Sequence, residues 1–474
     1  MAHERLRNFV DGKWTEPVDG DHVDLLDPCT GAAYLSVPSS GPKDVDAVMT
    51  AAAAAFRDWR STTPNHRQQV LLRIADALES RADEFAAAEA RCTGSAAAAG
   101  EVPLMVDQLR FFAGAARLLE GRSAGEYVPG RTSYVRREPV GVCAQLAPWN
   151  FPLLMAVLKS APAIAAGNTV VLKPAESTPL SALMYAELVA EFVPAGVLNV
   201  VCGGPDTGRL MVEHREPAMV SLTGSVEAGM NVAAAAAAGL KRVHLELGGN
   251  TPVVVCADAD VPTAVEKIIE GAVGNAGQDC TATARVLAAE EVYREVVDGL
   301  AAAAAKVRPG PPSDPDAHYG PLNNAAQLAR VDGLVDRLPA HARVVTGGHR
   351  HGDVGYFYAP TVIADVRQDD EITQNEIFGP VVTVQPFRDE REAVELANGV
   401  RQGLASSVWT TDHARAMRLS GQLEFGTVWV NTVLGFPTEM PLGGFKHSGY
   451  GKDLSVYGFD AYTRIKHVMH EFGA

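Results

Sequence analysis

Two kinds of segment alternate along most of the chain. Alanine-rich amphipathic stretches predict helices, because alanine is the best helix former; they cover residues 48–59, 232–241 and 300–307. Short β-branched runs predict largely buried strands; they cover residues 169–173, 219–222, 243–247, 252–255, 381–384 and 427–431. This alternation predicts an α/β fold with parallel sheets.

Residues 121–140 break the alternation. The sequence SAGEYVPGRTSYVRREP has an extended, turn-containing pattern, which predicts a hairpin. An arm for another subunit and an ordinary surface hairpin are equally compatible with it. The prolines and the glycine in PGPPSDPD, residues 309–316, predict an irregular surface connection. No repeat or linker divides the chain cleanly.

The length and charge of the chain indicate how many domains it has and which partners it does not bind. The 474 residues predict two or three domains. Acidic residues outnumber basic ones by 57 to 41, a net charge of −16, and such a surface repels phosphate backbones. We therefore expect no nucleic-acid partner.

The cysteine pattern and the length of the apolar runs indicate the cellular compartment of the protein. The six cysteines contain no Cys-x-x-Cys pair, which argues against a disulfide framework or zinc site and for a reducing, cytoplasmic compartment. The pairs His349 with His351 and His467 with His470 lack further ligands, so we expect no metal. The longest apolar run, residues 232–240, is too short to span a membrane, and we expect a soluble protein.

Cys280 lies in NAGQDCTA, after a glycine-containing turn. A lone cysteine is more often an inert buried residue than a nucleophile. A thiolate is nevertheless a good nucleophile for a carbonyl carbon, and the N–H groups of a turn would favour the anion.

Glu246 and Asn150 are two further candidates. Glu246 ends an apolar strand in HLELGGN, where burial would raise its pKa toward the range of a general base; a structural ion pair explains it equally well. Asn150 stands between prolines in APWNFP, where its amide could hold an oxyanion or simply form a turn.

Three patterns could bind a ligand at strand ends. Lys173 and Glu176 in VVLKPAE are placed to bind ribose hydroxyls, or are a solvated pair. Gly224 and Ser225 in SLTGSVEAG form a glycine turn that could receive a phosphate at a helix N-terminus. The dinucleotide fingerprint G-x-G-x-x-G is absent, so the usual nicotinamide signature does not apply.

Taken in order, PWN, KPAE, LTGS, ELGG, GQDC, EIFGP and PLGGFKHSGYGKDLS resemble the NAD(P)-dependent aldehyde dehydrogenase superfamily over essentially the whole chain. The resemblance implies two Rossmann-like α/β domains with parallel sheets and a small β oligomerisation arm. The NAD-binding domain would comprise residues 1–119 and 140–247, the catalytic domain 248–450, and the arm with the C-terminal strand 120–139 and 451–474. A homotetramer, as a dimer of dimers, or a dimer would follow.

The resemblance also implies the chemistry. Cys280 would attack the aldehyde, the Asn150 side chain and the Cys280 N–H would hold the oxyanion, and Glu246 would activate the water that hydrolyses the thioester. Lys159 and Asp453 match positions that relay protons, although Asp453 is one methylene shorter than the usual Glu.

Cofactor contacts follow from the same motifs. Lys173 and Glu176 would bind the adenosine ribose, Ser225 with Gly224 the pyrophosphate, and Glu376 with Phe378 the nicotinamide side. The remaining contacts would come from Trp149, Leu247 and Gly248. Because Glu176 repels a ribose phosphate, we expect NAD to be preferred to NADP.

The motifs are most similar to the gamma-aminobutyraldehyde and betaine aldehyde branch, whose substrates carry a distal cation. Such a cation needs an aromatic face or a carboxylate. Phe151 occupies one expected aromatic position, but Leu158 and Gly274 occupy the other two. Asp107 could supply a compensating charge, or be a solvated helix residue, and Phe436 could close the pocket mouth.

Three alternatives stay open. The substrate could be an uncharged aliphatic or aromatic aldehyde. A CoA-acylating enzyme of the same fold typically lacks the glutamate base, so Glu246 argues against it. A catalytically silent structural or binding protein is disfavoured by the presence of Cys280, Glu246 and Asn150 together.

Overall fold

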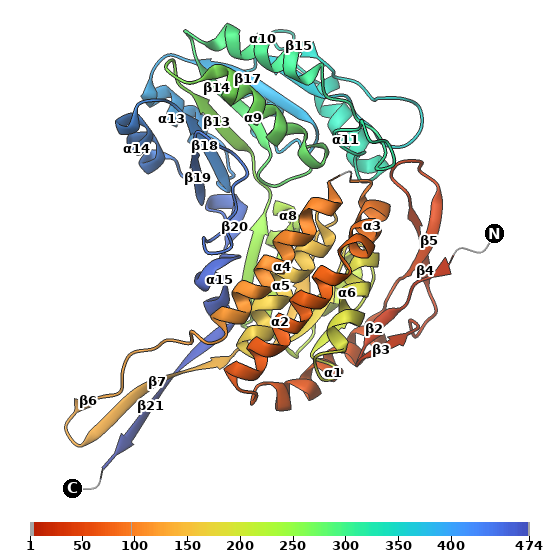
Figure 1. The fold of residues 1–474 in the computed structure, drawn as a ribbon, viewed down its shortest axis with the longest axis vertical. Helices are drawn as coiled ribbons and strands as arrows, with labels where there is room; N and C mark the ends of the chain where they lie inside the picture. Colours follow the sequence, from red (N-terminus) through yellow and green to blue (C-terminus); the bar gives the residue numbers. More distant parts are fainter. Residues whose placement is uncertain (1–3, 96, 473–474) are drawn as a thin grey trace.

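The computed structural model describes residues 4–95 and 97–472. Two large sheets, each covered by helices, form two bodies with a narrow junction between them, and a thin arm extends from one body (Figure 1). The predicted α/β class is confirmed, because both sheets have parallel strands at their centre.

The larger sheet has the strand order β20-β12-β11-β8-β9-β10-β2-β3. Strands β12 to β10 in this order run parallel, and β20, β2 and β3 are antiparallel additions at the edges. The bounds are Gly449–Tyr450, Arg242–Leu247, Pro217–Gly224, Val142–Leu146, Thr169–Lys173, Leu198–Val200, Asn8–Val10 and Lys13–Thr15.

Helices cover both faces of this sheet. Along β8, Cys143 packs into one apolar core, whereas Val142 and Ala144 pack into another, as the two-residue period of a strand requires. The first core is closed by α2 (Pro64–Ser80), α4 (Ala98–Ala115), α5 (Pro152–Ala166) and α6 (Leu180–Ala190), with α3 (Ala82–Thr93) beside them. The second is closed by α1 (Pro42–Trp59), α7 (Pro205–Glu213) and α8 (Val226–Ala237).

The second sheet has the order β15-β16-β17-β14-β13-β18-β19, antiparallel only at β15. Its strands are Arg343–Thr346, Thr361–Ala364, Val381–Phe387, Thr283–Ala289, Thr251–Val255, Ala405–Trp409 and Thr427–Val430. The associated helices are α9 (Val261–Val273), α10 (Tyr293–Ala304), α11 (Ala325–Asp336), α12 (Glu371–Gln374), α13 (Glu390–Asn398) and α14 (His413–Gln422), and one apolar core joins them to the sheet.

Two three-stranded sheets complete the fold. The arm contains β6 (Gly125–Val128), β7 (Arg131–Pro139) and β21 (Thr463–Glu471), so the predicted hairpin exists and pairs with the C-terminal strand. The other sheet contains β1 (Glu4–Arg5), β4 (His22–Leu26) and β5 (Ala33–Pro38). Two 3-10 helices, η1 (Gly274–Gly277) and η2 (Lys446–Ser448), and α15 (Ser455–Ala461) lie in connections.

The predicted elements are all present, but the helices begin earlier than predicted, and two of them also end earlier: α10, predicted to reach residue 307, ends at Ala304. The strand predicted at residues 169–173 has the bounds of β9. The helix predicted to reach residue 241 ends at Ala237 instead, because Gly239 follows and Leu240 has a positive φ of 49° and is 94% exposed.

Candidate active site

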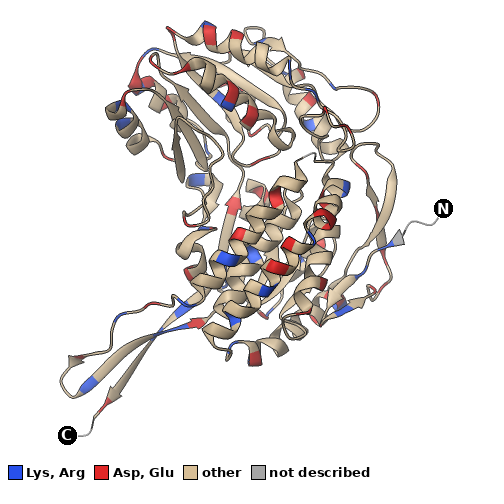
Figure 2. Ribbon diagram, in the orientation of Figure 1, with Lys and Arg blue, Asp and Glu red and all other residues tan. Residues whose placement is uncertain are grey.

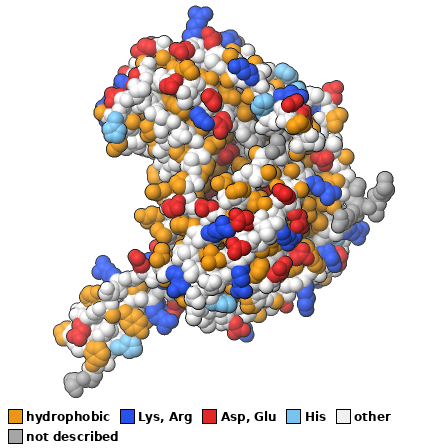
Figure 3. All heavy atoms as spheres, viewed as in Figure 1, with side chains coloured by type: hydrophobic (Ala, Val, Ile, Leu, Met, Phe, Trp, Pro, Cys, Tyr) orange, Lys and Arg blue, Asp and Glu red, His pale blue; other side chains and the backbone are white. Residues whose placement is uncertain are grey.

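The predicted catalytic residues meet in one cavity at the junction of the two large sheets. It has a volume of about 430 Å³, and its walls include Asn150, Glu246 and Cys280. Strand β12 ends at Leu247 and β13 begins at Thr251, so the short connection between the two sheets runs beside this cavity. The space-filling view shows the surface hollowed between the two bodies (Figure 3).

The turn that carries Cys280 is tightly constrained. Asn275, Ala276 and Gly277 have positive φ angles of 47°, 57° and 69°, which reverse the chain after α9. A Cβ atom on Gly249 would lie 1.9 Å from the Cys280 carbonyl oxygen, so the β12–β13 connection packs directly against the cysteine backbone. Cys280 itself is partly exposed.

The expectation that turn N–H groups favour a thiolate is wrong for this state of the protein. Burial raises the pKa of Cys280 well above its usual value, and the negative charges of Glu246, Asp279 and Glu376 raise it further. The Cys280 thiol and the Glu246 carboxyl group line the same cavity. The thiol is therefore protonated at neutral pH, with a proton acceptor beside it.

Glu246 is buried near the end of β12, next to Thr223 of β11 in the sheet register. Burial raises its pKa to about 8, and the charge of Asp453 raises it while that of Lys159 lowers it. Its Oε1 has no hydrogen-bond partner among the described residues. A carboxyl group with this pKa can exchange protons near neutral pH.

Asn150 is held by the same turn as Cys280. Its Nδ2 donates to the Gln278 carbonyl oxygen at 3.0 Å, and its own carbonyl accepts from Asn275 Nδ2 at 2.8 Å. The two motifs PWN and GQDC, far apart in sequence, are thus fixed against each other. This places an amide N–H group beside the cavity that contains Cys280.

Lys159 and Asp453 are also brought to this region, and both are buried. Asp453 lines the cavity, whereas Lys159 Nζ donates to Ser221 Oγ at 3.1 Å. Sequence reasoning missed His244, whose Nδ1 is 2.9 Å from Ser221 Oγ and whose Nε2 is 3.7 Å from Asp453 Oδ2. Its position two residues before Glu246, on the same strand face, is the signal that could have identified it.

A second cavity of about 620 Å³ adjoins the first and contains most of the predicted cofactor contacts. Both cavities are lined by Trp149, Thr223 and Gly224, and the second is also lined by Lys173 and Glu176. Lys173 Nζ donates to the carbonyls of Pro174 and Gly203, at 3.0 and 2.8 Å, which holds the buried ammonium at the end of β9.

Ser225 begins α8. Its side chain accepts from the Ala228 N–H at 3.2 Å and lines the first cavity with Gly224. Leu247 packs against this helix, since a Cβ on Gly229 would lie 2.5 Å from its side chain. The N-terminus of α8, with its partial positive charge, therefore faces the cavity, as a phosphate site requires.

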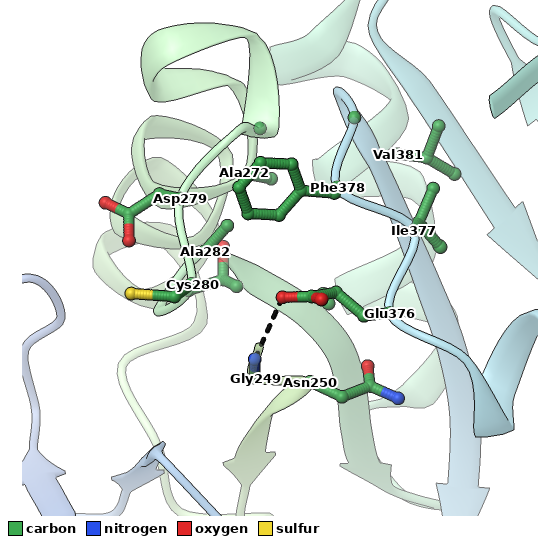
Figure 4. A pocket seen from close by; sticks show the side chains of 14 residues that line it. Gly249, Asn250, Ala272, Asp279, Cys280, Ala282, Glu376, Ile377, Phe378 and Val381 are labelled. Atoms are coloured by element: carbon green, nitrogen blue, oxygen red, sulfur yellow. Dashed lines mark hydrogen bonds between the residues drawn. The ribbon is translucent and has the colours of Figure 1, made fainter. Parts of the chain in front are cut away.

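Glu376 and Phe378 lie on the opposite wall. Glu376 Oε1 accepts from the Gly249 N–H at 2.9 Å, and a Cβ on Gly248 would lie 2.2 Å from Glu376 Oε2 (Figure 4). Burial raises the pKa of Glu376 to about 7. Phe378, which has a positive φ of 55°, packs edge-on against Trp149 with ring centroids 5.4 Å apart.

The predicted substrate residues divide into two groups. Phe151 and Leu158 line the cavity with Cys280, and Gly274 lines a different depression beside α9. Asp107 and Phe436 are not among the residues of the catalytic cavity. Asp107 is exposed on α4 and accepts from Thr438 Oγ1 at 2.5 Å, which joins this helix to the loop that carries Phe436; Phe436 itself packs edge-on against Trp429.

In residues 4–95 and 97–472, no group of three or more His, Cys, Asp or Glu side chains is arranged to hold a metal ion. Over the same ranges, no helix is both long and apolar enough to cross a membrane.

The sequence and the structure were compared with known proteins. The model of the aldehyde dehydrogenase family matches residues 14–468. An aldehyde dehydrogenase of Emericella nidulans is 41% identical over 98% of this chain and 95% of its own. An NAD-dependent aldehyde dehydrogenase structure from Sinorhizobium meliloti is 36% identical, with a TM-score of 0.97 over 100% of this chain and 96% of its own. A betaine aldehyde dehydrogenase structure from Staphylococcus aureus, in complex with NAD⁺, is 32% identical, with a TM-score of 0.96 over 99% and 95%.

Proposed function

The chain belongs to the aldehyde dehydrogenase family, and from this premise we propose that it oxidises an aldehyde with a distal amine or quaternary ammonium group to the carboxylate. The enzyme is an NAD-dependent aldehyde dehydrogenase. The observation that carries the mechanism is the meeting of Cys280, Glu246 and Asn150 in one cavity.

The residues around the two adjoining cavities fit NAD. The cavities share Trp149 and Gly224 and so form one elongated space that suits an extended dinucleotide. Lys173 and Glu176 would bind the adenosine ribose, and Ser225 at the start of α8 the pyrophosphate. Glu376, Phe378 and the backbone at Leu247 and Gly248 would surround the nicotinamide end. When bound, NAD⁺ supplies the hydride acceptor.

In the first half of the reaction, we assign Cys280 as the nucleophile. Its sulfur attacks the aldehyde carbon as the thiol proton passes to Glu246, a carboxyl group that lines the same cavity. The oxyanion is held by the Asn150 amide and the Cys280 N–H. Loss of hydride from the carbon leaves a thioester on Cys280.

In the second half, we assign Glu246 as the base. Glu246 must first release its proton, and Asp453 and Lys159 are the buried titratable groups whose charges act on it most directly after Cys280. A water oxygen then bonds to the thioester carbon, its proton goes to Glu246, and the carbon–sulfur bond breaks. The carboxylate product and the free thiol result.

The proposal for a cationic substrate is supported by charge. The chain carries a net charge of −16, and among the described residues the catalytic cavity is lined by Glu227 and Asp453 and by one cation, Arg330. Glu246 and Glu376 also line it, but burial raises their pKa values to about 8 and about 7, so they are only partly ionised near neutral pH. Acidic and basic residues are interspersed over the helices, with acidic ones beside the junction (Figure 2). Such a field attracts a cationic aldehyde. Asp107 and Phe436 are proposed to shape the pocket mouth, where their segments meet.

A second candidate substrate class is an uncharged aldehyde. It is favoured by the apolar walls Phe151, Met155, Leu158 and Leu442 of the same cavity. These side chains match an aliphatic or aromatic group better than an ammonium group.

A substrate comparison decides between the two classes. NADH formation is measured with gamma-aminobutyraldehyde, betaine aldehyde and an uncharged aldehyde of similar length, with Cys280→Ala as the blank. We expect kcat/KM for a cationic aldehyde to be at least about tenfold higher, or about 1.4 kcal/mol in transition-state binding. A higher kcat/KM for the uncharged aldehyde would overturn the assignment of substrate class.

Three further assignments are proposals of the same kind. We propose the domain division at residues 1–119 and 140–247, 248–450, and 120–139 with 451–474. We propose assembly into a homotetramer, as a dimer of dimers, or a dimer, through the arm. A cytoplasmic location is proposed from the cysteine pattern.

A further inference from the structure

A row of buried polar side chains crosses the larger sheet beside Glu246. His244 of β12 is the register partner of Ser221 on β11, and Ser221 is the partner of Gln145 on β8. All three side chains are buried. Because side chains alternate along a strand, His244 lies on the same face as Glu246, one step away.

Short contacts connect this row to two buried charged groups. Lys159 Nζ donates to Ser221 Oγ at 3.1 Å, and Ser221 Oγ is 2.9 Å from His244 Nδ1. Since Ser221 accepts from the ammonium group, its hydroxyl hydrogen is available to His244 Nδ1. We assign the ring proton to Nε2, the nitrogen 3.7 Å from Asp453 Oδ2, because Ser221 can then donate to Nδ1.

The network has open ends beside the catalytic cavity. His244 Nε2, Asp453 Oδ2 and Glu246 Oε1 are buried without a hydrogen-bond partner among the described residues. Asp453 and Glu246 both line the cavity that contains Cys280. A small movement of a side chain closes a gap of 3.7 Å to hydrogen-bonding distance. The buried donor of His244 is therefore directed at an acceptor beside the proposed base.

The backbone around the ring is fitted to it. Gly451 has a φ of 93°, and a Cβ at this position would lie 2.2 Å from His244 Cδ2. The segment that carries Asp453 thus approaches the imidazole more closely than any other residue type would allow. This contact fixes the ring between Ser221 and Asp453.

We propose that His244 is a positioning residue for thioester hydrolysis, whose Nε2–H group holds Asp453 as the acceptor of the proton that Glu246 takes from water. The inference rests on the proposed function. The water O–H bond breaks as the oxygen bonds to the thioester carbon, and the proton moves to Glu246 and then to Asp453. Lys159 and Ser221 keep His244 in the tautomer that donates to Asp453.

The charges around the ring agree with a neutral imidazole. Burial lowers the pKa of His244, and the cations Lys159 and Lys452 lower it further, whereas Asp453 raises it. Other titratable groups near this row include Glu246, Cys143 and Tyr462, which accepts from Gln145 at 3.2 Å. A neutral ring with its proton on Nε2 is a donor at neutral pH.

The test separates acylation of the cysteine from hydrolysis of the acyl enzyme. p-Nitrophenyl acetate is used without NAD⁺ on the full chain, so that the burst of p-nitrophenolate reports acylation and the steady state reports hydrolysis. For His244→Met we expect the steady-state rate to fall at least fivefold and the burst rate to stay within twofold. The rising limb of the pH profile should move to higher pH. Without the His244 N–H group, the negative charge of Asp453 is less compensated, and it raises the pKa of Glu246 further.

Two further variants serve as controls for His244→Met. His244→Gln keeps an amide donor and should return the pH profile toward that of the wild type. Thr169→Val removes a buried hydrogen bond, to the Ala52 carbonyl at 2.9 Å, from the same sheet but away from the cavity. This matched control should leave the pH profile unchanged.

The outcomes are distinguishable. A His244→Met enzyme that folds and keeps the wild-type pH profile and steady-state rate would overturn the inference. If His244→Met does not fold, the nearly isosteric variant Ser221→Ala is measured instead. The rising limb of its pH profile must then lie at higher pH than that of the wild type for the inference to stand. If Cys280→Ala gives a burst as large as that of the wild type, the proposed function itself would be refuted.

Discussion

Carboxyl groups near Cys280 dominate the chemistry of the site at the scale of single residues. Glu246, Asp279 and Glu376 each raise the pKa of the thiol, so the cysteine depends on proton transfer rather than on a preformed thiolate. Burial raises the pKa of Glu246 to about 8, and the charges of Asp453 and Asp279 add to this effect. Nucleophile and base therefore act as a pair, and a change to one alters the other.

Glu101, a buried residue of α4, should make stability depend on pH. Burial, with the charges of Glu89 and Asp279, raises its pKa to about 9, whereas the value is roughly 4.3 in an unfolded chain. Between these values the native state binds a proton that the unfolded state has lost, so the free energy of unfolding falls as pH rises. Glu101→Gln should match the wild type near pH 5 and exceed its stability by about 1–3 kcal/mol near pH 8.5.

Urea unfolding at both pH values checks this prediction. Glu295→Gln, at an exposed position on α10, is the matched control and should show no difference that depends on pH. A stability difference for Glu101→Gln that is the same at both pH values would show that Glu101 is already ionised in the folded protein.

Glu176 should determine the preference for NAD over NADP. Its carboxylate lines the second cavity at the proposed ribose end, where it repels a 2′-phosphate. Glu176→Gln should raise the ratio of kcat/KM with NADP⁺ to that with NAD⁺ about tenfold, or about 1.4 kcal/mol. Glu187→Gln, exposed on α6, should leave the ratio unchanged; an unchanged ratio in Glu176→Gln would place the ribose elsewhere.

Short motifs identified candidate residues whose roles remain predictions. Cys280, Glu246 and Asn150 stand in short patterns, and all three line one cavity. His244 and Ser221 escaped notice because neither belongs to a motif, and their link depends on the register between β11 and β12. The expectation of a thiolate rested only on the turn N–H groups, whereas burial and carboxyl groups from separate segments raise the pKa of Cys280.

At the scale of elements, the connection between β12 and β13 should not tolerate a side chain at position 249. A Cβ on Gly249 would lie 1.9 Å from the Cys280 carbonyl oxygen, which forces the turn of the nucleophile away from the connection. Gly249→Ala should cost about 1–3 kcal/mol of stability and lower kcat more than tenfold.

Gly114→Ala is the matched control for this change. A Cβ on Gly114, in α4, meets no atom within 4 Å, and alanine there should slightly stabilise the helix. Thermal unfolding and steady-state kinetics measure both variants. Wild-type kcat in Gly249→Ala would mean that the turn does not need its observed position.

Element types were predictable from the sequence, whereas element ends depended on local detail. The buried strands are uninterrupted β-branched runs, so β9 was predicted with its observed bounds. The early end of α8 was not, because its alanines continue past the point where Leu240 adopts a positive φ. The pairing of β7 with β21, more than 300 residues apart, could not be inferred from local pattern alone.

At the scale of the whole molecule, the arm of β6, β7 and β21 presents an exposed apolar surface. Tyr127 and Ile465 are 65% and 67% exposed, and apolar side chains follow the arm in the space-filling view (Figure 3). If the arm joins subunits, Ile465→Glu should reduce the sedimenting mass of the assembly while the subunit stays folded.

Val354→Glu controls for an added charge on an equally exposed apolar residue, since Val354 is 64% exposed on the second body. Analytical ultracentrifugation should show this variant assembled like the wild type. An unchanged mass for Ile465→Glu, or a monomeric wild type, would remove the role of the arm in assembly.

The account depends most on the division of labour between Cys280 and Glu246, and one single-turnover measurement tests it. Each enzyme is mixed with excess NAD⁺ and aldehyde, and both NADH and the mass of the intact subunit are followed. We predict that Glu246→Gln forms about one NADH per subunit, more slowly than the wild type because the Cys280 thiol has lost its proton acceptor, retains one acyl group on Cys280 and turns over at least about 100-fold more slowly, which is about 2.7 kcal/mol. Cys280→Ala should form neither NADH nor acyl enzyme. Sustained NADH formation by Cys280→Ala, or wild-type turnover by Glu246→Gln without an acyl intermediate, would contradict the account.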